Sequence, residues 1–204
     1  MLKYYYGVMG SGKSAKIIEY YTKHKATVCL KLKFEEEFFD VIHSRNGKSV
    51  PCINFMKNSD LIKLYFETPS INKAKTLIID EVQFCSDNQI KQLEEISHSM
   101  DVICFGLLRT NDGSLFSSTK LLLELSDYTK ELRRKCVCCN KNNATVSRRY
   151  VSTDFRKYRQ SDITYTRPVL SSKNMKYLSM CNDCARKYKE FSKKEINTIL
   201  KEVL

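Results

Sequence analysis

The sequence lacks long apolar runs, internal repeats and low-complexity segments. A membrane-spanning helix needs about 20 consecutive apolar residues, so the absence of such a run argues against a membrane protein. With 42% hydrophobic residues among 204, the chain can still bury a core and is not typical of a disordered protein. The N-terminus begins with a strand and a glycine-containing loop instead of a secretory signal, so we expect a soluble cytoplasmic protein.

Acidic residues are fewer than basic ones, 23 against 35, and the net charge is +12. Such a charge suits anionic ligands, nucleic acids included. However, the chain has no dense basic tract; the nearest is residues 131–135. It also lacks the sequence of a helicase-like second lobe or of a basic groove studded with aromatic residues. We therefore expect phosphate ligands and a solvated surface to account for the charge, and no nucleic-acid partner.

The most informative feature is the segment from Gly7 to Ser14, GVMGSGKS, which fits the phosphate-loop pattern G-x-x-x-x-G-K-[ST]. Glycines let the backbone curl until several N–H groups point at one anion, and the helix that follows adds its own N-terminal N–H groups. In such loops the lysine, here Lys13, reaches the β- and γ-phosphates, and the hydroxyl, here Ser14, ligates Mg²⁺. The predicted ATP and Mg²⁺ ligands in the loop are Gly7, Gly10, Ser11, Gly12, Lys13 and Ser14.

The first part of the chain alternates between strand-like and helix-like segments. We predict strands at residues 2–6, 27–30, 77–79 and 102–106, and helices at residues 15–24, 90–100 and 120–133. Continuous apolar strands separated by helices indicate a parallel sheet covered on both faces. The fold class is therefore α/β, a RecA-like phosphate-loop NTPase sheet flanked by helices.

The character of the sequence changes at Lys135, where cysteines and polar residues replace the periodic pattern. We predict a long loop at residues 150–176 and a charged amphipathic helix in the tail, residues 185–204. The predicted domains are a nucleotide-binding domain (residues 1–134), a small zinc-binding domain (135–190) and a C-terminal helix (191–204).

Two carboxylates follow the apolar segment at residues 77–79. In phosphate-loop proteins an aspartate in this place, here Asp80, holds Mg²⁺ directly or through water. Glu81 is then placed to act as a base or to position water. Pairs of acidic residues also occur at helix caps. It is the phosphate loop upstream that identifies Asp80 and Glu81 as candidate site residues.

Nine cysteines fall into two groups. Four are scattered in or near apolar stretches and are expected to be reduced and buried: Cys29, Cys52, Cys85 and Cys104. The others include two C-x-x-C pairs, Cys136/Cys139 and Cys181/Cys184, which can supply four thiolates to a structural Zn²⁺. Disulfides and a redox dithiol are the alternatives, opposed by a reducing compartment and by the missing thioredoxin-like context. Cys138 is surplus.

Together these motifs resemble the type II, zinc-containing thymidine kinases. The similarity covers nearly the whole chain in the right order. The matching segments are the phosphate loop with Met9, Ser44-Arg45-Asn46-Gly47, Asp80-Glu81-Val82-Gln83-Phe84, Cys104-Phe105-Gly106-Leu107, Gly113-Ser114-Leu115-Phe116 and the four paired cysteines. Tyr177, just before Cys181, is similar to the tyrosine of the family's substrate-covering loop, the lasso, which makes the zinc-binding domain a lasso domain.

The resemblance implies transfer of the ATP γ-phosphoryl group to the 5′-hydroxyl of thymidine. It implies Glu81 as the general base, with Lys13 catalytic beside it, and it groups Gln83 with the ATP and Mg²⁺ ligands. The substrate-binding residues would be Met9, Phe84, Leu107 and Tyr177. The implied cofactors are Mg²⁺ with ATP and a structural Zn²⁺, and the implied assembly is a homotetramer.

Three segments depart from the family pattern. Ser171-Ser172-Lys173 replaces the lasso's usual I-G-G, Asn111 replaces an aromatic residue, and Glu36 replaces an arginine thought to stabilise the transferred phosphoryl group. Arg45 or Lys33 could compensate for that arginine. These departures favour the alternative function, a non-catalytic or altered-specificity relative that binds nucleotide or nucleoside as a sensor or partner module. The intact Lys13, Ser14, Asp80 and Glu81 oppose it.

Overall fold

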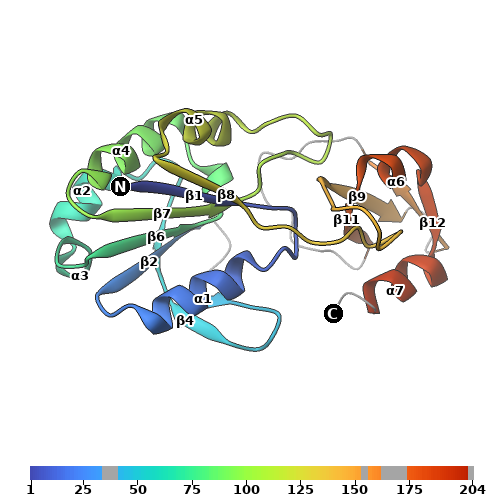
Figure 1. The fold of residues 1–204 in the computed structure, drawn as a ribbon, viewed down its shortest axis with the longest axis horizontal. Coiled ribbons are helices and arrows are strands. Elements are labelled where there is room, and N and C mark those ends of the chain that lie inside the picture. The colour runs from blue at the N-terminus through green and yellow to red at the C-terminus, as the bar shows by residue number, and fades with distance from the viewer. Residues whose placement is uncertain (34–40, 153–155, 162–173, 202–204) are drawn as a thin grey trace. The chain divides into compact units, whose positions relative to one another are not determined.

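The computed structural model describes residues 1–33, 41–152, 156–161 and 174–201 (Figure 1). The chain forms two compact units that interleave along the sequence. Unit 1 comprises residues 1–6, 12–108 and 116–132, and unit 2 comprises residues 7–11, 109–115 and 133–204. Within the described residues, no helix is both long enough and apolar enough to cross a membrane.

Unit 1 is built on a six-stranded sheet in the order β5-β2-β6-β7-β1-β8. The strands are β1 (Leu2–Tyr6), β2 (Thr27–Leu32), β5 (Ile53–Phe55), β6 (Thr76–Asp80), β7 (Asp101–Gly106) and β8 (Tyr128–Glu131). Every pairing between them is parallel. The central strand β6 is buried along its whole length, as its unbroken apolar sequence predicts for a strand covered on both faces.

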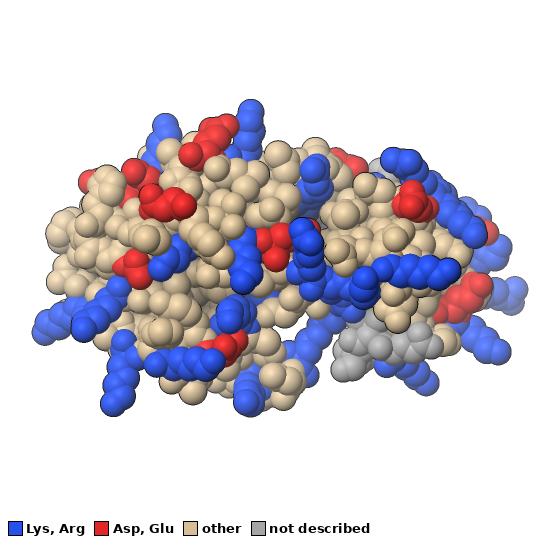
Figure 2. All heavy atoms as spheres, viewed as in Figure 1, with Lys and Arg blue, Asp and Glu red and all other residues tan. Residues whose placement is uncertain are grey.

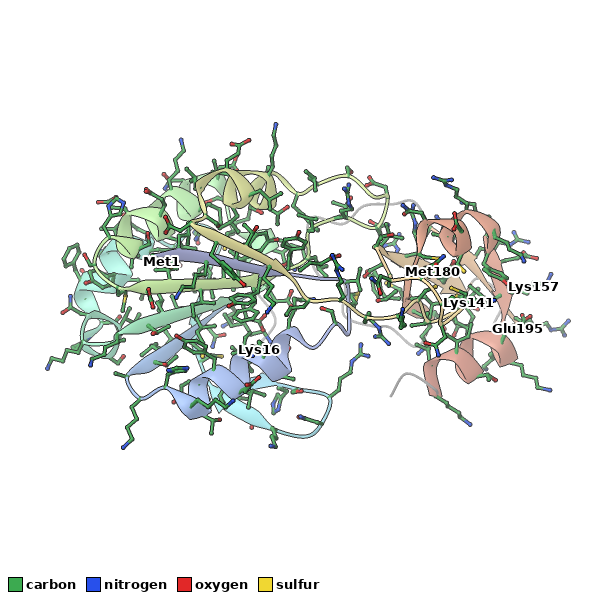
Figure 3. All side chains as sticks on the ribbon, viewed as in Figure 1. Met1, Lys16, Lys141, Lys157, Met180 and Glu195 are labelled. Carbon is green, nitrogen blue, oxygen red and sulfur yellow. The ribbon has the colours of Figure 1, made fainter. Side chains whose placement is uncertain are left out.

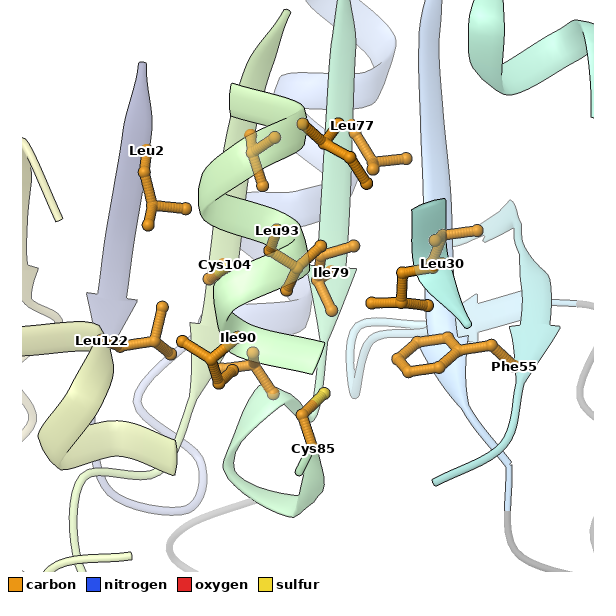
Figure 4. Close-up of a cluster of buried hydrophobic side chains, with 14 of the residues drawn as sticks. Leu2, Leu30, Phe55, Leu77, Ile79, Cys85, Ile90, Leu93, Cys104 and Leu122 are labelled. Carbon is orange, nitrogen blue, oxygen red and sulfur yellow. The ribbon is translucent and has the colours of Figure 1, made fainter. Parts of the chain in front are cut away.

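Helices cover both faces of this sheet (Figure 1). One face packs against α1 (Lys13–Lys23) and the hairpin of β3 (Val41–His43) and β4 (Ser49–Pro51). The other face packs against α2 (Leu61–Glu67), α3 (Pro69–Asn72), α4 (Asp87–Ser97) and α5 (Ser117–Leu125). Figure 4 shows the second core, where Leu93 of α4 packs with Ile79 of β6. The predicted α/β fold with a parallel, doubly covered sheet is confirmed.

The start of α4 shows how the sequence fixes an element locally. The Ser86 hydroxyl accepts a hydrogen bond from the Gln89 N–H (3.2 Å), and the Gln89 side-chain carbonyl accepts one from the Ser86 N–H (3.1 Å). This reciprocal capping box satisfies two backbone donors that the helix leaves unpaired at its first turn. The periodic apolar residues Ile90, Leu93 and Ile96 then face the core.

The predicted helix at residues 120–133 is wrong in its second half. Helix α5 ends at Leu125, and residues 128–131 form the edge strand β8, which pairs in parallel with β1. The Asp127 carboxylate accepts a hydrogen bond from the Leu2 N–H (2.7 Å), and the Asp127 N–H donates to the Leu2 carbonyl (2.9 Å). These bonds to the first strand override a local sequence that has no Pro or Gly to end the helix.

Unit 2 contains a four-stranded antiparallel sheet in the order β11-β9-β10-β12. Its elements are β9 (Val146–Ser152), β10 (Lys157–Gln160), β11 (Met175–Met180), α6 (Asn182–Lys187), β12 (Glu190–Ser192) and α7 (Lys193–Lys201). Met180, labelled in Figure 3, is the last residue of β11.

Two predictions about this region are wrong. Residues 150–176, predicted to be a loop, contain the end of β9, the whole of β10 and the start of β11. The tail, predicted to be one helix, is divided into α6, β12 and α7. Ser192 and Glu195 form a new capping box at the start of α7, which explains where the chain re-enters a helix.

We expect Leu93→Ala to destabilise unit 1 by about 2–5 kcal/mol, because Leu93 is fully buried between α4 and the sheet. Denaturant unfolding of the zinc-loaded protein measures this change. The matched control is Phe66→Ala on α2, whose side chain is 68% exposed and whose loss should cost less than about 0.5 kcal/mol. Equal effects of the two substitutions would contradict the packing described here.

Candidate functional site

The phosphate loop has the glycine conformations that its sequence predicts. Gly10 and Gly12 have φ of 70° and 88°, a left-handed region that other residues rarely adopt. The Ser11 N–H donates to the Val8 carbonyl (3.2 Å), closing the loop on itself, and α1 begins at Lys13 directly after Gly12. The N-terminus of α1 therefore follows the loop immediately, the arrangement that favours binding of an anion.

Strand β6 ends at Asp80, a buried carboxyl group that accepts a hydrogen bond from the Glu81 N–H (3.0 Å). Burial, and then the neighbouring charge of Glu81, raise the pKa of Asp80 to about 7, while Lys31 and Lys13 act in the opposite direction. Burial lowers the pKa of Lys13, and Glu81 and Asp80 oppose that change. The structure thus brings Lys13, Asp80 and Glu81 into mutual electrostatic range. A divalent cation at Asp80 would favour its ionised form.

Glu81 is the residue with the most unusual backbone in this part of the structure. Its φ of 58° and ψ of 33° lie in the left-handed region, and it precedes the short 3₁₀ helix η1 (Val82–Phe84). Backbone strain of this kind costs about 1–3 kcal/mol and persists only where the surroundings enforce it. The conformation turns the chain sharply after Asp80, so that two adjacent carboxylates leave the same strand end.

Gln83 holds the Glu81 carboxylate in place. The Gln83 side-chain amide donates a 2.6 Å hydrogen bond to Glu81 Oε2, and its Oε1 accepts one from the Leu107 N–H (3.0 Å). The Gln83 backbone carbonyl accepts a further bond from the Ser118 hydroxyl (2.8 Å). Gln83 is 3% exposed, so little water competes for these bonds. The side chain of Glu81 is thereby fixed to the end of β7.

Gly106 makes this arrangement possible. A Cβ added at Gly106 would lie 2.6 Å from Gln83 Oε1 and 2.9 Å from Val82 Cγ1, closer than such atoms approach. Gly106 is therefore required for the close approach of η1 to β7 and not for a special φ. The sequence motifs did not predict this role of Gly106, although a glycine that ends a buried apolar strand is a signal of such contact.

Two predicted substrate residues lie in unit 1 near this network. The Phe84 ring meets Phe116 edge-on, with centroids 5.8 Å apart. Leu107 follows β7, and its carbonyl accepts a hydrogen bond from the buried Tyr4 hydroxyl (3.0 Å). Both side chains are partly exposed, as a ligand-binding surface requires.

Ser14 is the second residue of α1 in unit 1. Five other predicted nucleotide and substrate residues belong to unit 2: Gly7, Met9, Gly10, Ser11 and Tyr177. Tyr177 lies on β11 opposite Arg149 of β9. Asn111, which replaces an aromatic residue, donates to the Ser161 carbonyl (3.1 Å), and its own carbonyl accepts from Arg148. The departures at Glu36 and at Ser171-Ser172-Lys173 lie outside the described residues.

The four paired cysteines converge within unit 2. The Sγ atoms of Cys136, Cys139, Cys181 and Cys184 all lie within 4.8 Å of one another, and the Cys139–Cys181 distance is 4.0 Å. Sulfurs bound at about 2.3 Å to a tetrahedral zinc lie about 3.8 Å apart, so the cluster fits this metal. Four close cysteines could therefore hold a structural zinc ion, with no coordination position left for catalysis.

The backbone around the first cysteine pair also suits a metal. Hydrogen bonds from the backbone of Asn142 and Lys141 lower the pKa of Cys139 to about 6, which favours the thiolate that zinc requires. The turn depends on Asn140, whose φ of 52° is left-handed, and on its N–H bond to the Cys136 carbonyl (2.9 Å). The surplus Cys138 behaves differently, because burial raises its pKa to about 12.

Basic residues are dispersed on the face shown in Figure 2, with Asp and Glu side chains among them. Several pair with acidic neighbours, for example Lys16 and Lys23 with Glu19. This distribution matches the expectation of a solvated, generally positive surface.

The fold and this arrangement of loop, carboxylates and cysteines define an α/β phosphate-loop protein with a four-cysteine centre. The sequence model described as "Thymidine kinase" matches residues 1–185. The chain belongs to the thymidine kinase family.

Relatives in bacteria carry the same name. A thymidine kinase of Salmonella paratyphi A is 28% identical over 187 residues, covering 88% of this chain and 87% of the relative. The thymidine kinase of Escherichia coli K12 is 28% identical over 211 residues, covering 98% of this chain and 96% of the relative. That of Shewanella oneidensis is 30% identical over 152 residues, covering 71% and 79%.

Among solved structures, one of two Pif1 helicases coordinating DNA unwinding at forked double-stranded DNA is similar to part of the chain. The match has a TM-score of 0.28 at 14% identity. It covers 61% of this chain and 34% of the other.

We expect Cys139→Ser to lose zinc and Cys138→Ser to keep one zinc per chain. Of these two cysteines, only Cys139 is one of the four whose sulfurs lie close together. Loss of one of four ligands weakens structural zinc sites strongly. Metal analysis of the purified variants after dialysis against a weak chelator measures the difference. Retention of zinc by Cys139→Ser together with loss by Cys138→Ser would contradict the ligand set.

Proposed function

We propose that the protein transfers the γ-phosphoryl group of ATP to the 5′-hydroxyl of thymidine, giving thymidine monophosphate and ADP. Membership of the thymidine kinase family and the names of the bacterial relatives support this reaction. The observation that carries it is the Glu81 carboxylate, fixed by Gln83 beside Lys13 and Asp80. A base held rigidly next to a cation and a metal-binding carboxylate suits phosphoryl transfer to a hydroxyl.

The phosphate-binding roles follow from the loop. Backbone N–H groups of the phosphate loop other than those of Met9 and Ser11, which bond Ser147 and Val8, would cradle the phosphates, and Lys13 would contact their β- and γ-oxygens. Ser14 and Asp80 would hold Mg²⁺, which when bound neutralises charge on the phosphates. Burial lowers the pKa of Lys13, and the neighbouring charges of Glu81 and Asp80 oppose that change.

Glu81 would accept the proton of the 5′-hydroxyl as its oxygen bonds to the γ-phosphorus. The bond from that phosphorus to the bridging oxygen breaks, and ADP leaves. Gln83, predicted from the family motif to belong to the ATP and Mg²⁺ site, is better suited to positioning, because its amide is occupied by Glu81 and Leu107.

The substrate roles rest on the family resemblance and the exposure of these side chains. Phe84 would stack on the base, Met9 and Leu107 would contact it, and Tyr177 on β11 would take the role of the tyrosine in the family's covering segment. A structural zinc ion held by Cys136, Cys139, Cys181 and Cys184 would anchor the end of β11. We further propose a cytoplasmic homotetramer, to be tested by light scattering.

The deciding experiment is a phosphoryl-transfer assay with Mg²⁺ and ATP against thymidine, deoxyuridine, deoxycytidine and deoxyguanosine. Transfer to thymidine is the expected result. Transfer to another nucleoside would keep the mechanism and assign the altered specificity to Asn111 and the replaced lasso residues. Nucleotide binding without transfer to any nucleoside would favour the non-catalytic sensor instead.

We expect Glu81→Gln to reduce turnover by about 10²–10⁴-fold, since an amide cannot accept the proton. The affinity for MgATP should change little, because Glu81 binds no phosphate in this assignment. Steady-state kinetics and nucleotide titration separate the two effects. Glu67→Gln on the exposed surface of α2 is the control. Full turnover in Glu81→Gln would disprove the base assignment.

We expect Gly106→Ala to lower kcat by about 10²-fold, because the added methyl group displaces Gln83 and with it the Glu81 carboxylate. The KM for ATP should rise far less. The control is Ser117→Ala, an exposed position at the start of α5. A variant with unchanged kcat would show that the Gln83 contact does not position the base.

A further inference from the structure

The first half of the phosphate loop is held by two serines of unit 2. The Met9 N–H donates to the Ser147 hydroxyl (2.9 Å), and the Met9 carbonyl accepts from the Ser179 hydroxyl (2.6 Å). Residues 7–11, Ser147 and Ser179 all belong to unit 2, so these contacts lie within one compact body. Both backbone groups of one loop residue are thus bonded by side chains more than 130 positions away in the sequence.

The two serines are matched in position. Ser147 on β9 and Ser179 on β11 are directly opposite each other in the antiparallel register of those strands. Both are buried, at 7% and 4% exposure, so their hydroxyls face little competition from water. Two opposed serines on neighbouring strands therefore bond the N–H and the carbonyl of a single turn residue.

The four-cysteine turn supports this site. The Val137 N–H, between Cys136 and Cys139, donates to the Ser179 carbonyl (3.0 Å). Ser179 also lies two residues before Cys181 on the same strand end. The strand that carries Ser179 therefore pairs with β9 and also bonds Val137, which lies in the turn between the predicted zinc ligands Cys136 and Cys139.

The consequence for the loop follows from peptide geometry. In a planar trans peptide the C=O and the next residue's N–H point in opposite directions. A Met9 carbonyl bonded to Ser179 therefore turns the Gly10 N–H away from Ser179. Arg134 adds to the same effect, because its guanidinium donates to the carbonyls of Met9 (3.4 Å) and Gly10 (3.2 Å). A loop that binds an anion needs its carbonyl oxygens turned away from that anion, and these bonds hold the Met9 and Gly10 carbonyls against side chains of unit 2.

We propose that Ser147 and Ser179 are positioning residues that keep the phosphate loop in its nucleotide-binding shape. This proposal rests on the proposed function only in assuming that the loop binds a nucleotide. The serines touch the loop backbone and no reacting atom. Their loss is expected to weaken ground-state binding of the phosphates and to leave the chemical step nearly intact.

The test compares Ser147→Ala and Ser179→Ala with Ser152→Ala, all in zinc-loaded protein with the zinc content measured. Ser152 is the matched control: it lies on β9 with Ser147, is 7% exposed, and its hydroxyl makes no hydrogen bond to other described residues. Titration with MgADP should show about five- to tenfold weaker binding for the first two variants, the worth of one hydrogen bond, and no change for the control. The KM for ATP should rise by the same factor, with kcat within about twofold.

Hydrogen exchange of peptides covering residues 7–11 gives a second readout that does not depend on catalysis. Exchange should quicken in Ser147→Ala and Ser179→Ala and stay unchanged in Ser152→Ala. If the first two variants match the control in both nucleotide affinity and exchange, the proposal is wrong. Failure of the wild-type protein to bind MgADP would overturn it as well.

A different result would refute the proposed kinase reaction. A wild-type protein that binds MgADP and loses affinity on either substitution, yet phosphorylates no nucleoside, would sustain the positioning role and refute the reaction.

Discussion

The placement of three charged side chains at the carboxyl end of a buried parallel strand is the constraint on which the unit 1 site depends. Asp80 and Glu81 leave β6 where helices cover both faces, so their charges must be compensated by groups arranged around them. Lys13 provides a positive charge, and Gln83 provides a hydrogen bond that fixes the direction of Glu81. The left-handed backbone of Glu81 and the missing side chain at Gly106 are both consequences of fitting these groups together.

Much of unit 1 could be predicted because its signals are local. The unbroken apolar run at residues 77–79 predicts a doubly covered strand, and the period of Ile90, Leu93 and Ile96 predicts the buried face of α4. The end of α5 could not be predicted, since it depends on hydrogen bonds between Asp127 and Leu2, which are 125 residues apart in the sequence. Local propensity carries no information about such a partner.

Unit 2 was harder to predict because its strands carry weak local signals. In β9 the buried positions do not alternate simply, and they include the charged Arg149, so the strand resembles a polar loop. The cysteine pairs were informative because metal coordination demands fixed residue types at fixed spacing. The candidate site likewise contains residues that local signals predict and residues that they do not. Motif spacing predicted Lys13, Asp80 and Glu81. Gly106, Ser147 and Ser179 act through contacts that only the folded chain creates.

The interleaving of the two units has a consequence for biosynthesis. Residues 7–11 leave the ribosome more than 130 residues before Ser147 and Ser179, the two serines that bond Met9. Strand β1 and helix α1 on either side of the loop can form earlier, together with the rest of unit 1. The nascent chain therefore holds an unfinished phosphate loop until β9 and β11 have emerged, and a motif near residue 10 waits for partners encoded far downstream.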